Sequence, residues 1–160
     1  MSDAAAGTYE IRWAEDKDWI PAMNMIWKTF LKFEAVDYTE EGIRNFYDFI
    51  TDEHLYKSFR QGRYQMMVAL DGARIIGAAS VRNYNHLSLL FVDEEYHHRG
   101  IGRNLMGRMC EYLKKEEGER YMSLQAAPYA VDFYRKLGFH AVHEEEAFSG
   151  IRVTPMEKFL

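Results

Sequence analysis

Arg99-Gly100-Ile101-Gly102 is the stretch whose residue types and spacing most favour chemistry, and that chemistry is phosphate binding. Glycine lets backbone N–H groups approach a ligand without a Cβ, and the first N–H groups of a helix lack intrahelical partners and favour an anion. His97, His98 and Arg103 add positive potential at the same point. Two glycines that open a helix often form only a turn, so the flanking elements must decide between the two interpretations. Two better-known phosphate loops do not fit: no Lys-Ser or Lys-Thr pair follows for a Walker-type loop, and Leu105 stands where a dinucleotide fingerprint needs its third glycine.

A strand and a helix are predicted to position this loop. The apolar run in His86–Val92 indicates a buried strand, and after the glycines an amphipathic helix is predicted to run to about Lys115, with Gly118 at its end. The apolar residues of this helix recur at helical spacing and predict one core-facing side: Ile101, Leu105, Met106, Met109, Tyr112 and Leu113. Strand, glycine loop and helix together favour a phosphate site over a simple turn.

The rest of the chain alternates strands and helices. Asp71-Gly72 predicts a hairpin turn between two strands, and residues 51–64 are weakly patterned. Ser149-Gly150 is expected to turn a final hairpin. The predicted strands are Tyr9–Trp13, Gln65–Leu70, Arg74–Val81, Tyr121–Ala126, His140–Ala147 and Ile151–Phe159, and the predicted helices run from Asp16 or Asp18 to about Phe33, from Thr39 to about Ile50, and from Pro128 to about Leu137. This order predicts a mixed α/β fold.

Composition limits the classes of protein that fit. The chain has 160 residues, enough for one domain with a sizeable core, and we expect that domain to span residues 8–160 after a flexible lead of residues 1–7. A net charge of −5 argues against nucleic-acid binding. The single Cys110 excludes an internal disulfide and a multi-cysteine metal site, and it is expected to be a buried helix residue. With no signal sequence and no long apolar run, we expect a cytoplasmic protein that does not bind membranes.

A second motif gives the loop a family context. The stretch Phe133-Tyr134-Arg135-Lys136-Leu137-Gly138-Phe139 follows the loop His97-His98-Arg99-Gly100-Ile101-Gly102. Together they resemble the GNAT superfamily of acyl-CoA N-acyltransferases, whose loop reads Gln/Arg-x-x-Gly-x-Gly/Ala and whose later helix commonly ends Phe-Tyr-x-Lys-Leu-Gly-Phe. The resemblance covers nearly the whole chain. It implies a central, mostly antiparallel twisted sheet of about seven strands with a splayed parallel pair, flanked by four helices.

The resemblance also implies a cofactor site for acetyl-CoA as the acyl donor, with no metal. Backbone amides of the loop would hold the CoA pyrophosphate, and the pantetheine arm would lie along the strand where it splays from the one at Tyr121–Ala126. The implied cofactor-binding residues are Leu90, Phe91, Val92, His97, His98, Arg99, Gly100, Ile101, Gly102 and Arg103. Two positions depart from the family pattern. His97 replaces Gln or Arg but can still donate to phosphate, and Ala127 stands where many relatives carry an Asn that contacts the cofactor.

Tyr134 matches the family tyrosine that protonates the departing CoA thiolate. A tyrosine can do this without forming an ion in the resting enzyme, and direct attack by an amine needs no covalent enzyme intermediate. The amine must be neutral, so a base is needed. His86 is the first candidate because its ordinary pKa is near neutral, and Glu34 is the second. A structural role for each, and a water chain to solvent, stay open.

The acceptor is expected to be a small-molecule amine. In this family the segment between the first two helices forms one wall of the acceptor site, which implies Phe33, Glu34, Asp37 and Tyr38 as substrate-binding residues. Acidic and aromatic residues suit a cationic amine, although Asp37 also makes sense as a loop charge. A CoA-binding module without turnover and a protein- or peptide-directed acetyltransferase are the alternatives, and a homodimer is left open.

Overall fold

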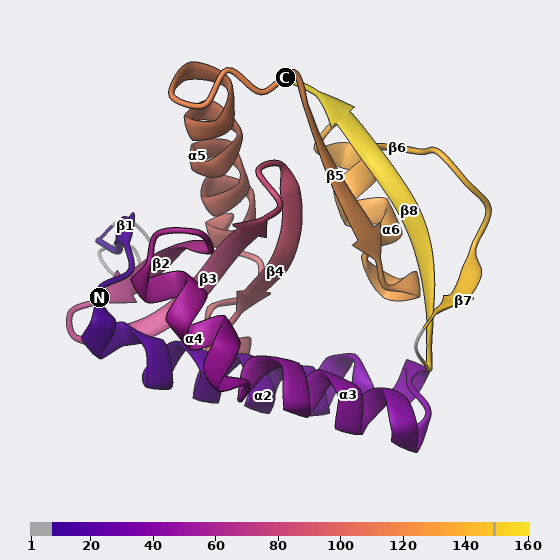
Figure 1. Ribbon diagram of the computed structural model, residues 1–160, viewed down its shortest axis with the longest axis horizontal. Helices are drawn as coiled ribbons and strands as arrows, with labels where there is room; N and C mark the ends of the chain where they lie inside the picture. The colour runs from indigo at the N-terminus through magenta and orange to yellow at the C-terminus, as the bar shows by residue number, and fades with distance from the viewer. Residues whose placement is uncertain (1–7, 149) are drawn as a thin grey trace.

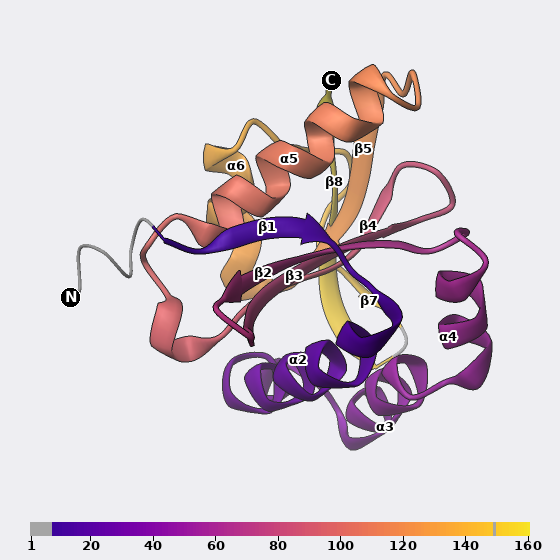
Figure 2. The ribbon, with the colours of Figure 1, turned by 90° about the vertical axis from the view of Figure 1, so that its left-hand side faces the viewer.

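A twisted sheet lies between two layers of helices in the computed structural model, which describes residues 8–148 and 150–160. Figure 2 shows α5 and α6 on one side of the sheet and α2, α3 and α4 on the other. The strands run in the order β1-β2-β3-β4-β5-β8-β6, and β7 pairs with β8 outside this path. The strands are β1 (Glu10–Trp13), β2 (Gln65–Asp71), β3 (Arg74–Arg82), β4 (His86–Val92), β5 (Tyr121–Ala126), β6 (His140–Ala141), β7 (Glu146–Phe148) and β8 (Ile151–Phe159).

The helices follow the predicted pattern with one addition. Their bounds are α2 (Trp19–Phe33), α3 (Glu40–Ile50), α4 (Glu53–Arg60), α5 (Ile101–Lys115) and α6 (Val131–Lys136), with short 3-10 turns η1 (Asp16–Asp18), η2 (Ala35–Asp37), η3 (Glu94–Tyr96) and η4 (Pro128–Ala130). The addition is α4, in the region expected to be weakly patterned. Its N-cap Asp52 accepts a hydrogen bond from the N–H of His54, and its apolar residues Leu55, Tyr56 and Phe59 recur at helical spacing. The expectation that residues 51–64 are weakly patterned is therefore wrong over this helix.

The mixed α/β fold with a mostly antiparallel sheet, a parallel pair and flanking helices is confirmed. The strand expected over residues 140–147 is two short strands, β6 and β7, which pair with separate parts of β8. The hairpin expected after them includes Ser149, which lies outside the described residues, as do residues 1–7 of the expected lead.

Each face of the sheet buries its own core. Leu105, Met109 and Leu113 of α5 are fully buried against one face, and Ile26 and Phe30 of α2 are fully buried against the other. Burial of such side chains stabilises a fold by about 1.5–3 kcal/mol each. The sheet is therefore fixed from both sides, and its strands can position functional groups rigidly.

The parallel pair β4 and β5 touches at one end only. Its paired residues are His86 and Ser123, and beyond them the two strands diverge, as Figure 1 shows. On the other side of β4, a bulge changes the register with β3: Val81 pairs with Leu87, but Ser80 pairs with Leu89. The extra residue of β4 is Ser88, and Tyr64 donates a hydrogen bond of 2.9 Å to its hydroxyl.

The bulge also changes which β4 side chains face each helix layer. Leu87 belongs to the core under α5, whereas Leu89 and Phe91 belong to the core under α2. Without an extra residue, Leu87 and Leu89 would face the same side, because strand side chains alternate. Along β4, the alternation of side chains between the two cores therefore reverses at Ser88, so the half of β4 that diverges from β5 is out of phase with the half that pairs with β5.

The start of α2 is fixed to β1 by a buried ion pair. Asp18 is 4% exposed, and its carboxylate accepts hydrogen bonds from the Arg12 guanidinium at 2.7 Å and from the Glu15 N–H at 2.7 Å. Burial alone would raise the pKa of Asp18, but these two hydrogen bonds outweigh burial and lower it. Asp18 is thus the N-cap residue of α2, one of the two expected positions, but its carboxylate accepts from the Glu15 N–H and from no N–H of α2.

Candidate active site

A loop with free backbone N–H groups joins β4 to α5. His98 and Gly100 have positive φ angles of 63° and 80°, and an ideal Cβ on Gly100 would meet nothing within 4 Å. Within the described part of the chain, no N–H from His98 to Arg103 donates a hydrogen bond to a protein atom, whereas the next one, on Asn104, donates to the Gly100 carbonyl at 3.0 Å. Such a concave row of N–H groups at a helix start binds anions. The loop therefore fits the pyrophosphate of CoA.

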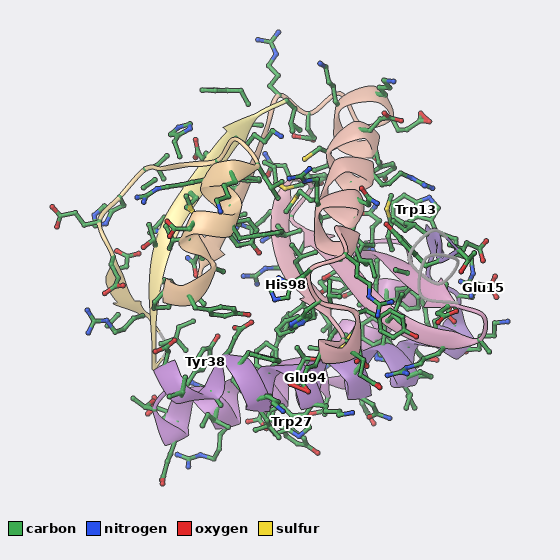
Figure 3. All side chains as sticks on the ribbon, turned by 180° about the vertical axis from the view of Figure 1, so that it is seen from behind. Trp13, Glu15, Trp27, Tyr38, Glu94 and His98 are labelled. Carbon is green, nitrogen blue, oxygen red and sulfur yellow. The ribbon has the colours of Figure 1, made fainter. Side chains whose placement is uncertain are left out.

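The side chains around this loop hold it in place. The ring Nε2–H of His97 donates to the Val92 carbonyl at 2.7 Å, so this imidazole ties the loop back to the end of β4. The Arg99 guanidinium lies 5.1 Å from the centre of the Tyr96 ring. Figure 3 shows the labelled His98 in the loop at the start of α5. The backbone of the loop, more than its side chains, thus provides the anion site.

A cavity of about 400 Å³ opens where β4 leaves β5. That volume is typical of sites for small molecules. Its walls come from α3, β4, β8 and the segment around η4, and include Glu34, Tyr38, Asn45, Phe46, Phe49, Arg82, His86, Ser88, Leu90, Phe91, Gln125, Ala127, Tyr129 and Tyr134. The diverging strands thus leave a space with both apolar and polar walls.

Tyr134 presents its hydroxyl to this cavity. The residue is 9% exposed, and its ring packs edge-on against Phe133 and Phe139. Its hydroxyl has no hydrogen-bond partner among the described residues, yet no described side chain buries an unpaired polar atom, so the hydroxyl opens onto the cavity. Burial, then the nearby Glu34 and Tyr129, raise its pKa well above the usual value. Tyr134 therefore keeps its proton at neutral pH.

Glu34 lines the same cavity with an altered acidity. Burial raises the pKa of its carboxyl to about 7, and the neighbouring charge of Asp37 acts in the same direction. Tyr129 donates a long hydrogen bond of 3.4 Å to Glu34 and opposes the rise. A carboxyl with this pKa exists in both protonation states near pH 7, so it can accept a proton and release it again.

His86 lies at the other end of the cavity wall formed by β4. Its Nδ1 shares a hydrogen bond of 2.9 Å with the Ser123 hydroxyl, across the parallel pair. Burial, and then the charge of Arg82, lower the pKa of His86 below its usual value. The imidazole is therefore neutral at neutral pH, and one of its nitrogens is engaged in joining β4 to β5.

The structure brings together only part of the expected substrate site. Glu34 and Tyr38 line the cavity, whereas Phe33 and Asp37 do not, and the Phe33 ring lies 5.0 Å from that of His97. Of the expected pantetheine residues, Leu90 and Phe91 line the cavity and Val92 does not. Ala127 lines it too, with a methyl group that cannot replace the amide contact of an Asn.

Tyr129 and Arg82 are among the cavity residues that were not predicted from the sequence. Tyr129 directly follows Pro128 in the segment that carries Tyr134, so its place in that motif was an available signal. Arg82 ends β3, and only the pairing of β3 with β4 places it beside His86.

No described group of three or more His, Cys, Asp or Glu side chains could hold a metal ion. Across the described residues, every helix is too short or too polar to cross a bilayer.

The wall that carries Tyr38 is joined to the end of the sheet. Tyr38 forms a bridge with Ile151, and the N–H of Thr39 donates to the Gly150 carbonyl at 2.9 Å. An ideal Cβ on Gly42 would lie 2.5 Å from that carbonyl oxygen, so only glycine allows this approach. Figure 3 shows the labelled Tyr38 at this junction, beside the lower end of β8. The cavity is therefore closed on this side.

Comparisons with known proteins agree with this geometry. Residues 34–160 match the family model described as an acetyltransferase (GNAT) domain. A GCN5-related N-acetyltransferase from Rhodopseudomonas palustris is 23% identical with a TM-score of 0.81, over 96% of this chain and 97% of that one. The PaiA N-acetyltransferase from Thermoplasma acidophilum, solved with coenzyme A, is 21% identical with a TM-score of 0.79, over 96% and 99%.

A more distant similarity links the fold to a polyamine enzyme. A chimera of the spermidine N-acetyltransferase SpeG from Vibrio cholerae is 20% identical with a TM-score of 0.68, and the match covers 96% of both chains. No curated protein sequence matches the chain at a significant level. The structural similarities establish the fold, and the family match establishes the class of protein.

Proposed function

We propose direct acetyl transfer to a small-molecule amine for this chain, which belongs to the GNAT family and is an acetyl-CoA-dependent N-acetyltransferase. Acetyl-CoA, when bound, supplies the acetyl group as an activated thioester. The loop from His98 to Arg103 would hold its pyrophosphate through free N–H groups, and the space between the diverging strands β4 and β5 would take the pantetheine arm. The size of the cavity favours a small acceptor over a protein substrate.

Glu34 is the base in this proposal, ahead of His86. An alkylamine has a pKa near ~10.4, so holding it neutral at pH 7 costs about 4–5 kcal/mol. Glu34 has a pKa of about 7, close to the ideal for a base at that pH, and its charge is felt by Tyr134. His86 shares its Nδ1 with Ser123, and the lowered pKa of its imidazole makes it the weaker base. Glu34 is therefore better placed to take the proton that the amine loses.

Tyr134 is the acid in this proposal. Its hydroxyl holds a proton at neutral pH and faces the cavity without a partner among the described residues, so the proton is available to the sulfur atom that leaves. This unpaired hydroxyl, in the same cavity as Glu34, is the observation that carries the proposal. No enzyme nucleophile is needed, because the amine attacks the carbonyl carbon itself.

Replacement of Tyr134 by Phe tests the mechanism. We expect Tyr134→Phe to lower kcat by about 10²-fold, because it removes the acid and keeps the ring. Release of free thiol from acetyl-CoA, with a panel of small amines, is the measurement. Tyr121→Phe is the matched control, since Tyr121 lies on β5 outside the cavity. If acetyl-CoA binds tightly and no amine or peptide releases thiol, the chain is a CoA-binding module; if only peptides do so, its acceptor is a protein.

A further inference from the structure

Arg82 is a cation without a protein counter-ion on the cavity wall. Within residues 8–148 and 150–160, no carboxylate forms an ion pair or hydrogen bond with its guanidinium, which lies 5.9 Å from the centre of the Phe49 ring. Phe49 and Arg82 both line the cavity. Stacking on an aromatic face orients a guanidinium and leaves its edge free for a ligand. Arg82 is therefore an exposed donor of paired hydrogen bonds that lies beside an aromatic ring and has no counter-ion among the described residues.

The cavity has two ends of different charge. The charge of Glu34 raises the pKa of both Tyr129 and Tyr134, whereas the charge that lowers the pKa of His86 is that of Arg82. Arg82 pairs with His86 at the start of β4, whereas Phe33, the residue before Glu34, lies against His97, beyond the other end of β4. An acidic, proton-accepting end thus lies apart from a basic end.

We propose that the acceptor is an amine that also carries a carboxylate, with the amine at Glu34 and the carboxylate at Arg82. A planar guanidinium pairs with a carboxylate through parallel hydrogen bonds, which gives both affinity and orientation. Of the described residues that line the cavity, Glu34 is the only carboxylate, and Arg82 would repel a second ammonium group. A polyamine therefore fits this cavity poorly. The inference rests on the proposed function and specifies its substrate class.

Three acceptors of equal chain length test this inference: δ-aminovalerate, pentylamine and cadaverine. They carry a carboxylate, no second charge and a second ammonium group, respectively. At saturating acetyl-CoA we expect the KM of δ-aminovalerate to be at least about tenfold below that of pentylamine, with cadaverine the poorest acceptor. Arg82→Gln should remove the difference between δ-aminovalerate and pentylamine, and Arg82→Lys should retain part of it, because lysine keeps the charge but not the planar fork.

Arg63→Gln is the matched control, because Arg63 is exposed and lies outside the cavity. It should leave the preference for δ-aminovalerate unchanged. A preference for cadaverine, or an equal loss with all three acceptors in Arg82→Gln, would overturn the inference. Pentylamine turnover with no preference for the carboxylate would overturn it and leave the proposed function intact.

Calorimetry with CoA-saturated protein separates the inference from the proposed function. If no amine is acetylated although acetyl-CoA binds, the proposed function fails. Binding of δ-aminovalerate that Arg82→Gln weakens about tenfold would then still support the carboxylate site. Binding that Arg82→Gln leaves unchanged would overturn it.

Discussion

Burial of the Glu34 carboxyl raises its pKa, and this rise should set the pH dependence of the proposed reaction. Because burial raises its pKa to about 7, the carboxyl is largely protonated at pH 6 and largely ionised at pH 8. We expect kcat/KM of the wild type to rise with pH through about 7. Glu34→Gln should lose about 10²-fold in kcat/KM at pH 8 and should lose this rise, since glutamine cannot accept the proton. Retention of the rise in Glu34→Gln, and its loss in His86→Gln, would assign the base to His86.

The same substitution has an opposite effect on stability. The folded protein binds a proton on Glu34 more tightly than the unfolded chain, whose pKa is the ordinary 4.5, so stability falls as pH rises from about 4.5 to about 7. Above this window the ionised carboxylate costs up to about 3 kcal/mol, which Glu34→Gln removes. Urea unfolding should show the variant to be the more stable protein at pH 8, with no such gain at pH 4. A variant less stable than the wild type at pH 8 would show that Glu34 is solvated.

At the scale of elements, β4, the loop after it and α5 form the proposed anion site. Gly100 adopts a φ of 80°, which costs a residue with a side chain about 1–2 kcal/mol, and a Cβ there would meet open space. We expect Gly100→Glu to weaken acetyl-CoA binding at least about tenfold, because it adds strain, bulk and a negative charge beside the pyrophosphate site. Gly107→Glu, in the same helix with open space around it, should bind acetyl-CoA normally in calorimetry. If Gly100→Glu and Gly107→Glu bind acetyl-CoA with equal affinity, the pyrophosphate does not bind at this loop.

The elements also explain which parts of the site could be predicted from the sequence. The loop and the helix with Tyr134 lie in contiguous motifs, and an amphipathic α5 and an apolar β4 have strong periodic signals, so these parts were predicted. Arg82 could not be predicted as a site residue, because its position beside His86 depends on the register between β3 and β4. The bulge at Ser88 could not be predicted from the sequence either, because its hydrogen bond to Tyr64 joins residues far apart in the sequence. Helix α4 was missed although Leu55, Tyr56 and Phe59 recur at helical spacing, because it spans only eight residues and most of them are polar.

At the scale of the molecule, the two helix layers would serve different parts of the proposed reaction. The layer with α5 carries the loop proposed to bind the pyrophosphate, and the layer with α2 and α3 closes the proposed acceptor cavity through its junction with β8 (Figures 1 and 2). The junction depends on two glycines in contact. Gly150 has a φ of 85°, and an ideal Cβ on it would lie 2.6 Å from the Thr39 hydroxyl oxygen and 2.7 Å from the Gly42 nitrogen. Any side chain at this turn must push α3 away from the sheet.

Replacement of Gly150 by Ala should therefore affect the acceptor and not the acyl donor. We expect Gly150→Ala to raise the KM of the amine several-fold and to leave acetyl-CoA affinity unchanged, because the anion loop lies in the other layer. The matched control is Gly62→Ala: Gly62 has a similar φ of 77° but open space around it, so it shares the backbone strain and lacks the clash. Gly150→Ala should lose more unfolding free energy than this control, by at least about 1 kcal/mol in urea titrations. If the two variants are equally stable and the amine KM is unchanged, α3 does not depend on this turn, and the acceptor wall is held by other contacts.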